Sequence, residues 1–194
     1  SYHGLANDQI MVLKSRKIDN ADLSDTLAIR LKAGLSTCLD LDGIKNSFEF
    51  ISRDDYNNYT YRISDIIVND EDLAYVIDFE PKQSSDPAMF RGTMYINTVD
   101  YALLHADFEI YPKFLDKMKE AFVSSPSHRF NTWPVSVKYS VSYRKFNERY
   151  YLNHVRGDLQ FIAKKKRRLF NSQFNVFFEM AVTETSLNNV TRFE

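Results

Sequence analysis

The sequence contains little cysteine, glycine or proline. Its 194 residues include one cysteine, five glycines and five prolines. A single cysteine, Cys38, excludes an internal disulfide and a cysteine-based zinc site. No glycine-rich phosphate-binding motif occurs, and five scattered glycines are too few to form one. The shortage of glycine and proline also leaves no linker-like segment, so we expect residues 1–194 to form a single domain.

The sequence also lacks an excess of either charge and lacks a long apolar run. Lysine and arginine total 25, aspartate and glutamate total 26, and the net charge is −1. We therefore expect no nucleic-acid partner, because nucleic-acid binders carry a basic excess. No apolar run approaches the roughly 20 residues of a membrane-spanning helix, so no transmembrane segment is predicted. An apolar content of 44% and an aromatic content of 14% exclude a disordered chain.

Residues with the spacing of a catalytic or metal centre are missing. The four histidines are scattered rather than paired, and no serine lies in a G-x-S-x-G motif. The acidic run 70–72 lies between two predicted strands and is typical of a hydrophilic turn. We therefore predict no catalytic residue, no metal site and no cofactor. A hydrolase is the alternative of lowest rank, and it requires His105 or His154 beside a carboxylate in a cleft.

From residue 59 onward, apolar and polar residues alternate. Five apolar residues at spacing two, from Val135 to Tyr143, predict a strand with one buried and one wet face. The segment from Phe174 to Val182 repeats this pattern. Further strands are predicted at 59–63, 75–79, 94–96, 101–111 and 150–163. Because the segments 97–100, 145–148 and 164–168 between strands are short, we expect antiparallel neighbours.

One helix is predicted within this series of strands. Pro112 suits a first helical turn, where its missing N–H costs nothing, and Pro126 prevents much extension. The apolar residues between them fall on one helical face: Phe114, Leu115, Met118, Ala121 and Phe122. In residues 10–50 the apolar spacing fits neither a helix nor a strand.

These patterns together predict an α+β, mainly β fold. We expect a curved antiparallel sheet, a half-barrel of roughly eight to ten strands, because a twisted sheet of this size curls. One or two helices should lie on its concave side, since one face of the sheet must be covered.

Two features suggest contacts with other molecules. The chain has 15 phenylalanines and 12 tyrosines, which either form ordinary β packing or line a cavity for an apolar ligand. In the second interpretation the candidate ligand-binding residues are Tyr139, Tyr143, Phe174 and Phe178. The basic run Lys164, Lys165, Lys166, Arg167 and Arg168 is either a solvated hairpin turn or a contact to membrane or phosphate.

Several segments resemble one recurring family pattern. They are YVIDFEP at 75–81, FRGTMYIN at 90–97, Ala102 with ADFE at 106–109, YSVSYR at 139–144, YLNHVR at 151–156 and FEMAVT at 178–183. The pattern is similar to that of secreted Bacteroidetes proteins described as carboxypeptidase-regulatory-like domain-containing. Asn97 and Leu103 depart from it, since Asp and Ile are usual there. With residues 10–16 and 39–46, the resemblance covers most of the chain.

The resemblance implies a location and a domain order. Family members carry a secretion signal and a small β-sandwich ahead of the region that this chain resembles. We therefore expect a fragment of a longer secreted protein, periplasmic or associated with the outer membrane. The region is also loosely similar to periplasmic lipoprotein carriers of the Lol type, which are half-barrels. The pattern transfers no catalytic residue, and no H-x-x-E zinc motif occurs.

Two non-enzymatic functions remain open at this level. The first is binding of a lipid, a lipidated segment or a hydrophobic envelope protein partner in the concave face. The second is a structural or protein-interaction module with a filled core and no ligand. A pocket on the apolar side of the sheet would favour the first, and a filled apolar side would favour the second.

Overall fold

The computed structural model describes residues 30–31, 35–69, 72–82, 90–118, 122–125, 130–165 and 171–186. Its elements, in chain order, are β1 (Arg30–Leu31), α1 (Leu35–Asp40), η1 (Glu49–Ile51), η2 (Tyr56–Asn58), β2 (Tyr59–Asn69), β3 (Asp72–Pro81), β4 (Phe90–Asn97), β5 (Leu103–Ile110), η3 (Pro112–Met118), β6 (Val123–Ser125), β7 (Phe130–Phe146), β8 (Arg149–Lys165) and β9 (Asn171–Ala181). The basic residues 166–168 and the loop 83–87 lie outside the described residues, as do the early segments 10–16 and 19–29.

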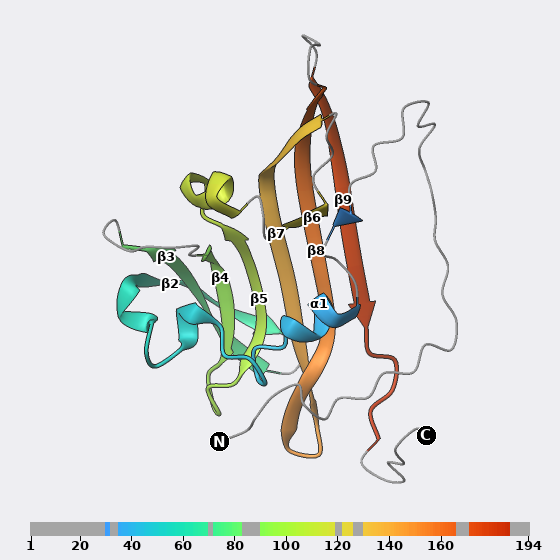
Figure 1. The fold of residues 1–194 in the computed structure, drawn as a ribbon. Coiled ribbons are helices and arrows are strands. Elements are labelled where there is room, and N and C mark those ends of the chain that lie inside the picture. Colours follow the sequence, from blue (N-terminus) through green and yellow to red (C-terminus); the bar gives the residue numbers. More distant parts are fainter. Residues whose placement is uncertain are drawn as a thin grey trace.

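Seven of these strands form one antiparallel sheet, in the order β2-β3-β4-β5-β7-β8-β9 (Figure 1). The order follows the chain except for the short β6, which pairs with β1 in a separate two-stranded sheet. The predicted curved, mainly antiparallel fold is therefore confirmed. The described residues contain nine strands, but only seven of them share the large sheet. Among the described residues, no helix is long and apolar enough to cross a membrane.

The turn between β7 and β8 accounts for part of the extra length of these strands over the prediction. Both strands have 17 residues, and pairing continues to Phe146 and Arg149. Only Asn147 and Glu148 remain for the turn, with φ of 46° and 60°. A two-residue hairpin turn with positive φ at both positions matches the twist of the flanking strands. A connection of four residues, 145–148, was predicted instead, because this segment is mostly polar.

The predicted helix at 112–122 is a 3-10 helix that spans Pro112–Met118. Its apolar face lies as predicted. Phe114 and Leu115 are buried, and Met118 packs against the same core. Phe122 follows as a further buried residue. The apolar positions therefore identified the buried face, although they did not distinguish 3-10 from α geometry.

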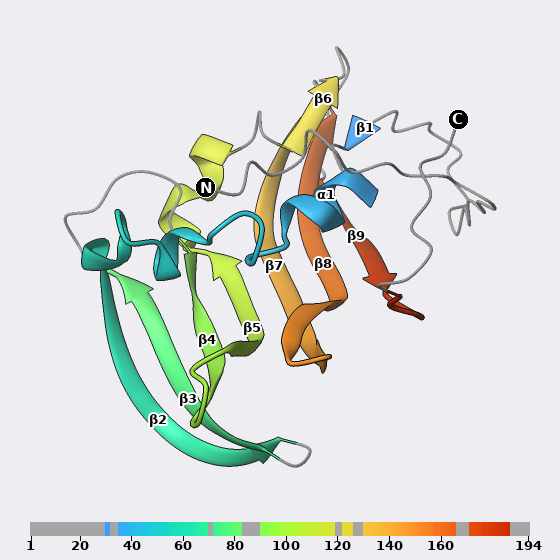
Figure 2. The same ribbon diagram turned by 90° about the horizontal axis from the view of Figure 1, so that it is seen from below.

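The apolar face of the sheet is covered by residues 35–58. α1 lies across β7 and β8, while η1 and η2 lie near the β2–β3 edge of the sheet (Figures 1 and 2). The N–H of Gly43 donates to the Tyr143 hydroxyl on β7 at 2.7 Å. The ring of Phe50, 1% exposed, stacks on Phe79 of β3 with 4.1 Å between centroids. This segment had no clear period because it packs through individual aromatic side chains.

A row of aromatic residues crosses the apolar face from strand to strand. The register places its members side by side: Tyr61, Phe79, Gly92, Phe108, Tyr139, Gly157 and Phe178. A glycine interrupts the row twice. At Gly157 an added Cβ would overlap the ring of Phe178, so this ring takes the space that a side chain would need. The row fills the centre of the apolar face between β3 and β9.

Candidate functional site

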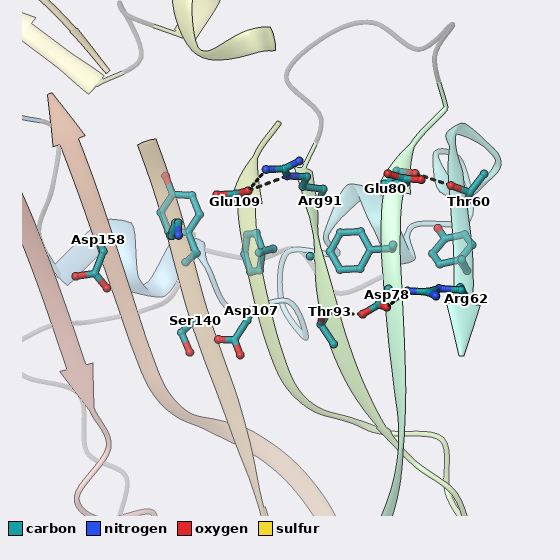
Figure 3. Close-up of a pocket in the computed structure, with 16 residues that line it drawn as sticks. Thr60, Arg62, Asp78, Glu80, Arg91, Thr93, Asp107, Glu109, Ser140 and Asp158 are labelled. Carbon is teal, nitrogen blue, oxygen red and sulfur yellow. Dashed lines mark hydrogen bonds and ion pairs between the residues drawn. The ribbon is translucent and has the colours of Figure 1, made fainter. Parts of the chain in front are cut away.

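A hollow of about 900 Å³ lies on the polar face of the sheet, opposite the apolar face that residues 35–58 cover (Figure 3). It crosses six strands from β2 to β8. Its lining consists of Thr60, Tyr61, Arg62, Asp78, Phe79, Glu80, Arg91, Gly92, Thr93, Asp107, Phe108, Glu109, Lys138, Tyr139, Ser140 and Asp158. The charged and hydroxyl side chains project into it, since in every strand they alternate with the residues of the aromatic row.

One long side of the hollow is a row of polar side chains from β2 to β7. The register aligns Arg62, Asp78, Thr93, Asp107 and Ser140. Arg62 Nη2 lies 2.9 Å from Asp78 Oδ2, and the Thr93 hydroxyl donates to Asp78 Oδ1 at 3.0 Å. These contacts hold the pKa of Asp78 below its usual value, the Thr93 hydroxyl having the largest effect. Asp78 is therefore a carboxylate at neutral pH.

The other long side is a second row, two residues further along each strand. Thr60 pairs with Glu80, Arg91 with Glu109, and Lys138 lies between Glu109 and Asp158 in register. Arg91 Nε donates to Glu109 Oε1 at 2.7 Å. At the far end, Arg156 makes two hydrogen bonds of 2.7 and 2.9 Å to Asp158. Cations and carboxylates thus alternate along this second row, whereas hydroxyl side chains separate the carboxylates of the first row (Figure 3).

Asp107 has different partners from the other carboxylates in the hollow. Its Oδ2 lies 2.9 Å from His105 Nε2, and the Ser140 hydroxyl also bonds its carboxylate. Both partners hold the pKa of Asp107 below its usual value, and the imidazole has the larger effect. Asp107 therefore carries a negative charge that no lysine or arginine of the lining pairs with in the register.

Both histidines named for the hydrolase alternative lie beside a carboxylate. His154 Nε2 is 2.7 Å from Glu179 Oε1, and His105 contacts Asp107. Of the His105–Asp107 pair, Asp107 lines the hollow. In a Ser-His-Asp triad the imidazole lies between the hydroxyl and the carboxylate. Here the Asp107 carboxylate lies between Ser140 and His105. No three His, Cys, Asp or Glu side chains gather as metal ligands within the described part of the chain.

A family of unknown function, DUF5686, matches residues 50–157. The match covers more than half of the chain. The chain belongs to this family. No curated protein and no solved structure matches. The segment shared with DUF5686 contains every residue that lines the hollow except Asp158.

The four predicted ligand-binding aromatics lie on the apolar side of this DUF5686 sheet. Tyr143 is 7% exposed, and burial raises the pKa of its hydroxyl. The Phe174 ring stacks on the Phe161 ring with 5.3 Å between centroids, and the centroids of the Phe178 and Tyr139 rings lie 6.5 Å apart. All four pack against or within the core, and Tyr139 alone among them also lines the hollow. A ligand contact by these residues stays a prediction.

The predicted membrane or phosphate contact is described only at its first residues. Lys164 is exposed near the end of β8, and Lys165 is the last residue of that strand. Strand β8 therefore reaches further into the basic run than predicted, and the run's role stays a prediction.

The polar face of the sheet was not predicted as a site. The sequence did contain an indication of this site, because charged residues alternate with the aromatic ones, among them Arg62, Asp78, Arg91 and Asp107. The same alternation identified buried aromatics and left the opposite residues as solvent-facing. Only the strand register shows that these residues form two rows.

Proposed function

We propose that this chain is a non-enzymatic binding module of the bacterial cell envelope. Its polar hollow receives a charged segment of a partner protein. The observation that carries the proposal is the position of the hollow on the polar face, with a charged lining. A volume of about 900 Å³ is within the range of binding sites.

The packing of the apolar face supports a polar ligand over an apolar one. Phe50, Phe108 and Phe161 are at most 3% exposed, so they occupy the space that an acyl chain would need there. In the hollow, by contrast, a ligand would meet guanidinium, ammonium and carboxylate groups. An acyl chain placed there would leave these groups without water, which is unfavourable.

The envelope location is supported by the resemblance to secreted Bacteroidetes proteins. We expect the native protein to fractionate with the periplasm or the outer membrane. Immunodetection in fractionated cells of the source organism measures this directly. Recovery in the cytoplasmic fraction alone would contradict the location and leave the binding proposal in place.

A second candidate function is binding of a lipid or other apolar ligand. It is favoured by a stripe of exposed apolar side chains on β2 and β3. Ile63, Ile66, Val68 and Leu73 are 61%, 54%, 72% and 52% exposed. Exposed apolar groups that lie together mark interaction sites more often than single ones do. This stripe lies beyond the part of the apolar face that η1 and η2 cover.

A spectroscopic titration separates the two functions. Amide NMR spectra of the 194-residue chain are recorded with three soluble peptides, SKSSSKS, SESSSES and SSSSSSS, and separately with dodecanoate. We expect a charged peptide to shift the amide signals of the hollow, for example Thr93 and Ser140. Saturable shifts only at Ile66 and Val68 with dodecanoate would support the apolar function instead. No shift in the hollow with any peptide would overturn the first proposal.

A further inference from the structure

The dimensions of the hollow define the shape of its ligand. Six strands about 4.8 Å apart make the hollow about 24 Å long across the sheet. Its two sides are side chains two residues apart on each strand, which separates them by about 7 Å. An extended peptide rises about 3.3 Å per residue, so about seven residues span this length. Such a peptide would lie between the two rows and across the strands.

The charges of the lining define which side chains that peptide should carry. The lining has five carboxylates and three cations: Asp78, Glu80, Asp107, Glu109 and Asp158 against Arg62, Arg91 and Lys138. Arg62 contacts Asp78, and Arg91 contacts Glu109. The charge of Lys138 helps to lower the pKa of Asp158, after the larger effect of Arg156. Lys138 lies between Glu109 and Asp158 in register, and Arg156 also contacts Asp158. The three cations of the lining are therefore placed at Asp78, Glu109 and Asp158.

Two carboxylates of the lining, Glu80 and Asp107, have no lysine or arginine of the lining assigned to them, and Asp107 keeps its contacts to His105 and Ser140. They lie on β3 and β5 and belong to opposite rows. Two strand spacings and one step between rows put them about 12 Å apart. Two residues at positions i and i+4 of an extended chain are about 13 Å apart, so two side chains at that spacing reach both carboxylates.

We propose that the hollow binds an extended peptide segment with two basic side chains, one at Glu80 and one at Asp107. This inference rests on the proposed function and specifies its ligand. The remaining carboxylate and guanidinium groups offer hydrogen bonds to the peptide backbone. Because the ion pairs are partly exposed, the interaction weakens as salt is added.

The test compares the three peptides of the NMR titration by fluorescence anisotropy. With the intact chain, SKSSSKS should bind more tightly than SESSSES and SSSSSSS. The double variant Glu80→Gln/Asp107→Asn should weaken binding of SKSSSKS about tenfold, because two ion pairs are lost. Both substitutions keep the size of the side chain at exposed positions. Glu80→Gln alone serves if the double variant unfolds in a thermal scan.

A matched control is Glu148→Gln, which removes a 92% exposed carboxylate at the β7–β8 turn, outside the hollow. It should leave the affinity unchanged. Equal binding of SESSSES, or no effect of the double variant, would overturn the basic-peptide inference while hollow shifts in the NMR spectra keep the proposed function. Absence of hollow shifts with every peptide would overturn both.

Discussion

The substitution Phe50→Ala should destabilise the fold by about 3–5 kcal/mol, the range for truncating a buried phenylalanine. Phe50 is 1% exposed. The centroid of its ring lies 4.1 Å from the ring centroid of Phe79, 5.1 Å from that of Phe48 and 5.3 Å from that of Phe108. Alanine would leave a cavity among these rings and remove the ring contacts of η1 with Phe79 and Phe108. Urea unfolding followed by circular dichroism measures the free energy of unfolding.

The same substitution at an exposed phenylalanine is the control. Phe177 on β9 is 65% exposed and its main partner is the Arg156 guanidinium, 5.2 Å from the ring centroid. Phe177→Ala should cost at most about 1 kcal/mol, the value of an exposed cation–π contact. Equal effects of the two substitutions would contradict the view that residues 35–58 complete the core. The apolar face would then be open, which favours the apolar ligand.

The substitution Gly92→Ala should destabilise the chain by about 2–3 kcal/mol or more, because it forces two backbones apart. A Cβ at Gly92 would overlap the carbonyl oxygen of Asp107 and lie 2.7 Å from Cα of Phe108. Neither atom can move without displacing β5. Since Asp107 lines the hollow, SKSSSKS should also bind Gly92→Ala more weakly. Thermal unfolding and the anisotropy titration measure the two effects.

Gly157→Ala is the comparison for Gly92→Ala. A Cβ at Gly157 would meet the ring of Phe178, not a backbone atom. The atoms that it would meet are the far end of the Phe178 side chain, which can shift more easily than a strand backbone. We expect a smaller loss of stability than at Gly92. A loss at Gly157 as large as at Gly92 would mean that side-chain crowding, and not the approach of β4 to β5, sets the cost.

The strands of this protein were predictable because their signal is local. Alternation from Val135 to Tyr143 depends only on which residues of one strand are apolar, and β7 contains all of them. The antiparallel order followed from short connections, as between β7 and β8. The Asn147–Glu148 turn was not predicted at its true length. A mostly polar segment predicts a loop, but here the pairing between β7 and β8 continues into that segment.

The hollow was not predictable in the same way. Its lining joins side chains from Thr60 to Asp158, and their alignment depends on the register of five strand pairs. That register includes irregularities between Ile63 and Asp65 and between Pro134 and Ser136. A shift of one residue at either place would turn the following side chains to the other face.

The sequence by itself determined a mainly antiparallel sheet with an aromatic face and a polar face, because alternation at spacing two acts within each strand. The tertiary structure alone decided which face is filled and which is hollow. Phe48 and Phe50 come from a segment without a clear period, and they cover the aromatic face by packing on distant strands. The charged residues opposite have no such cover in the described chain, so they line an open hollow.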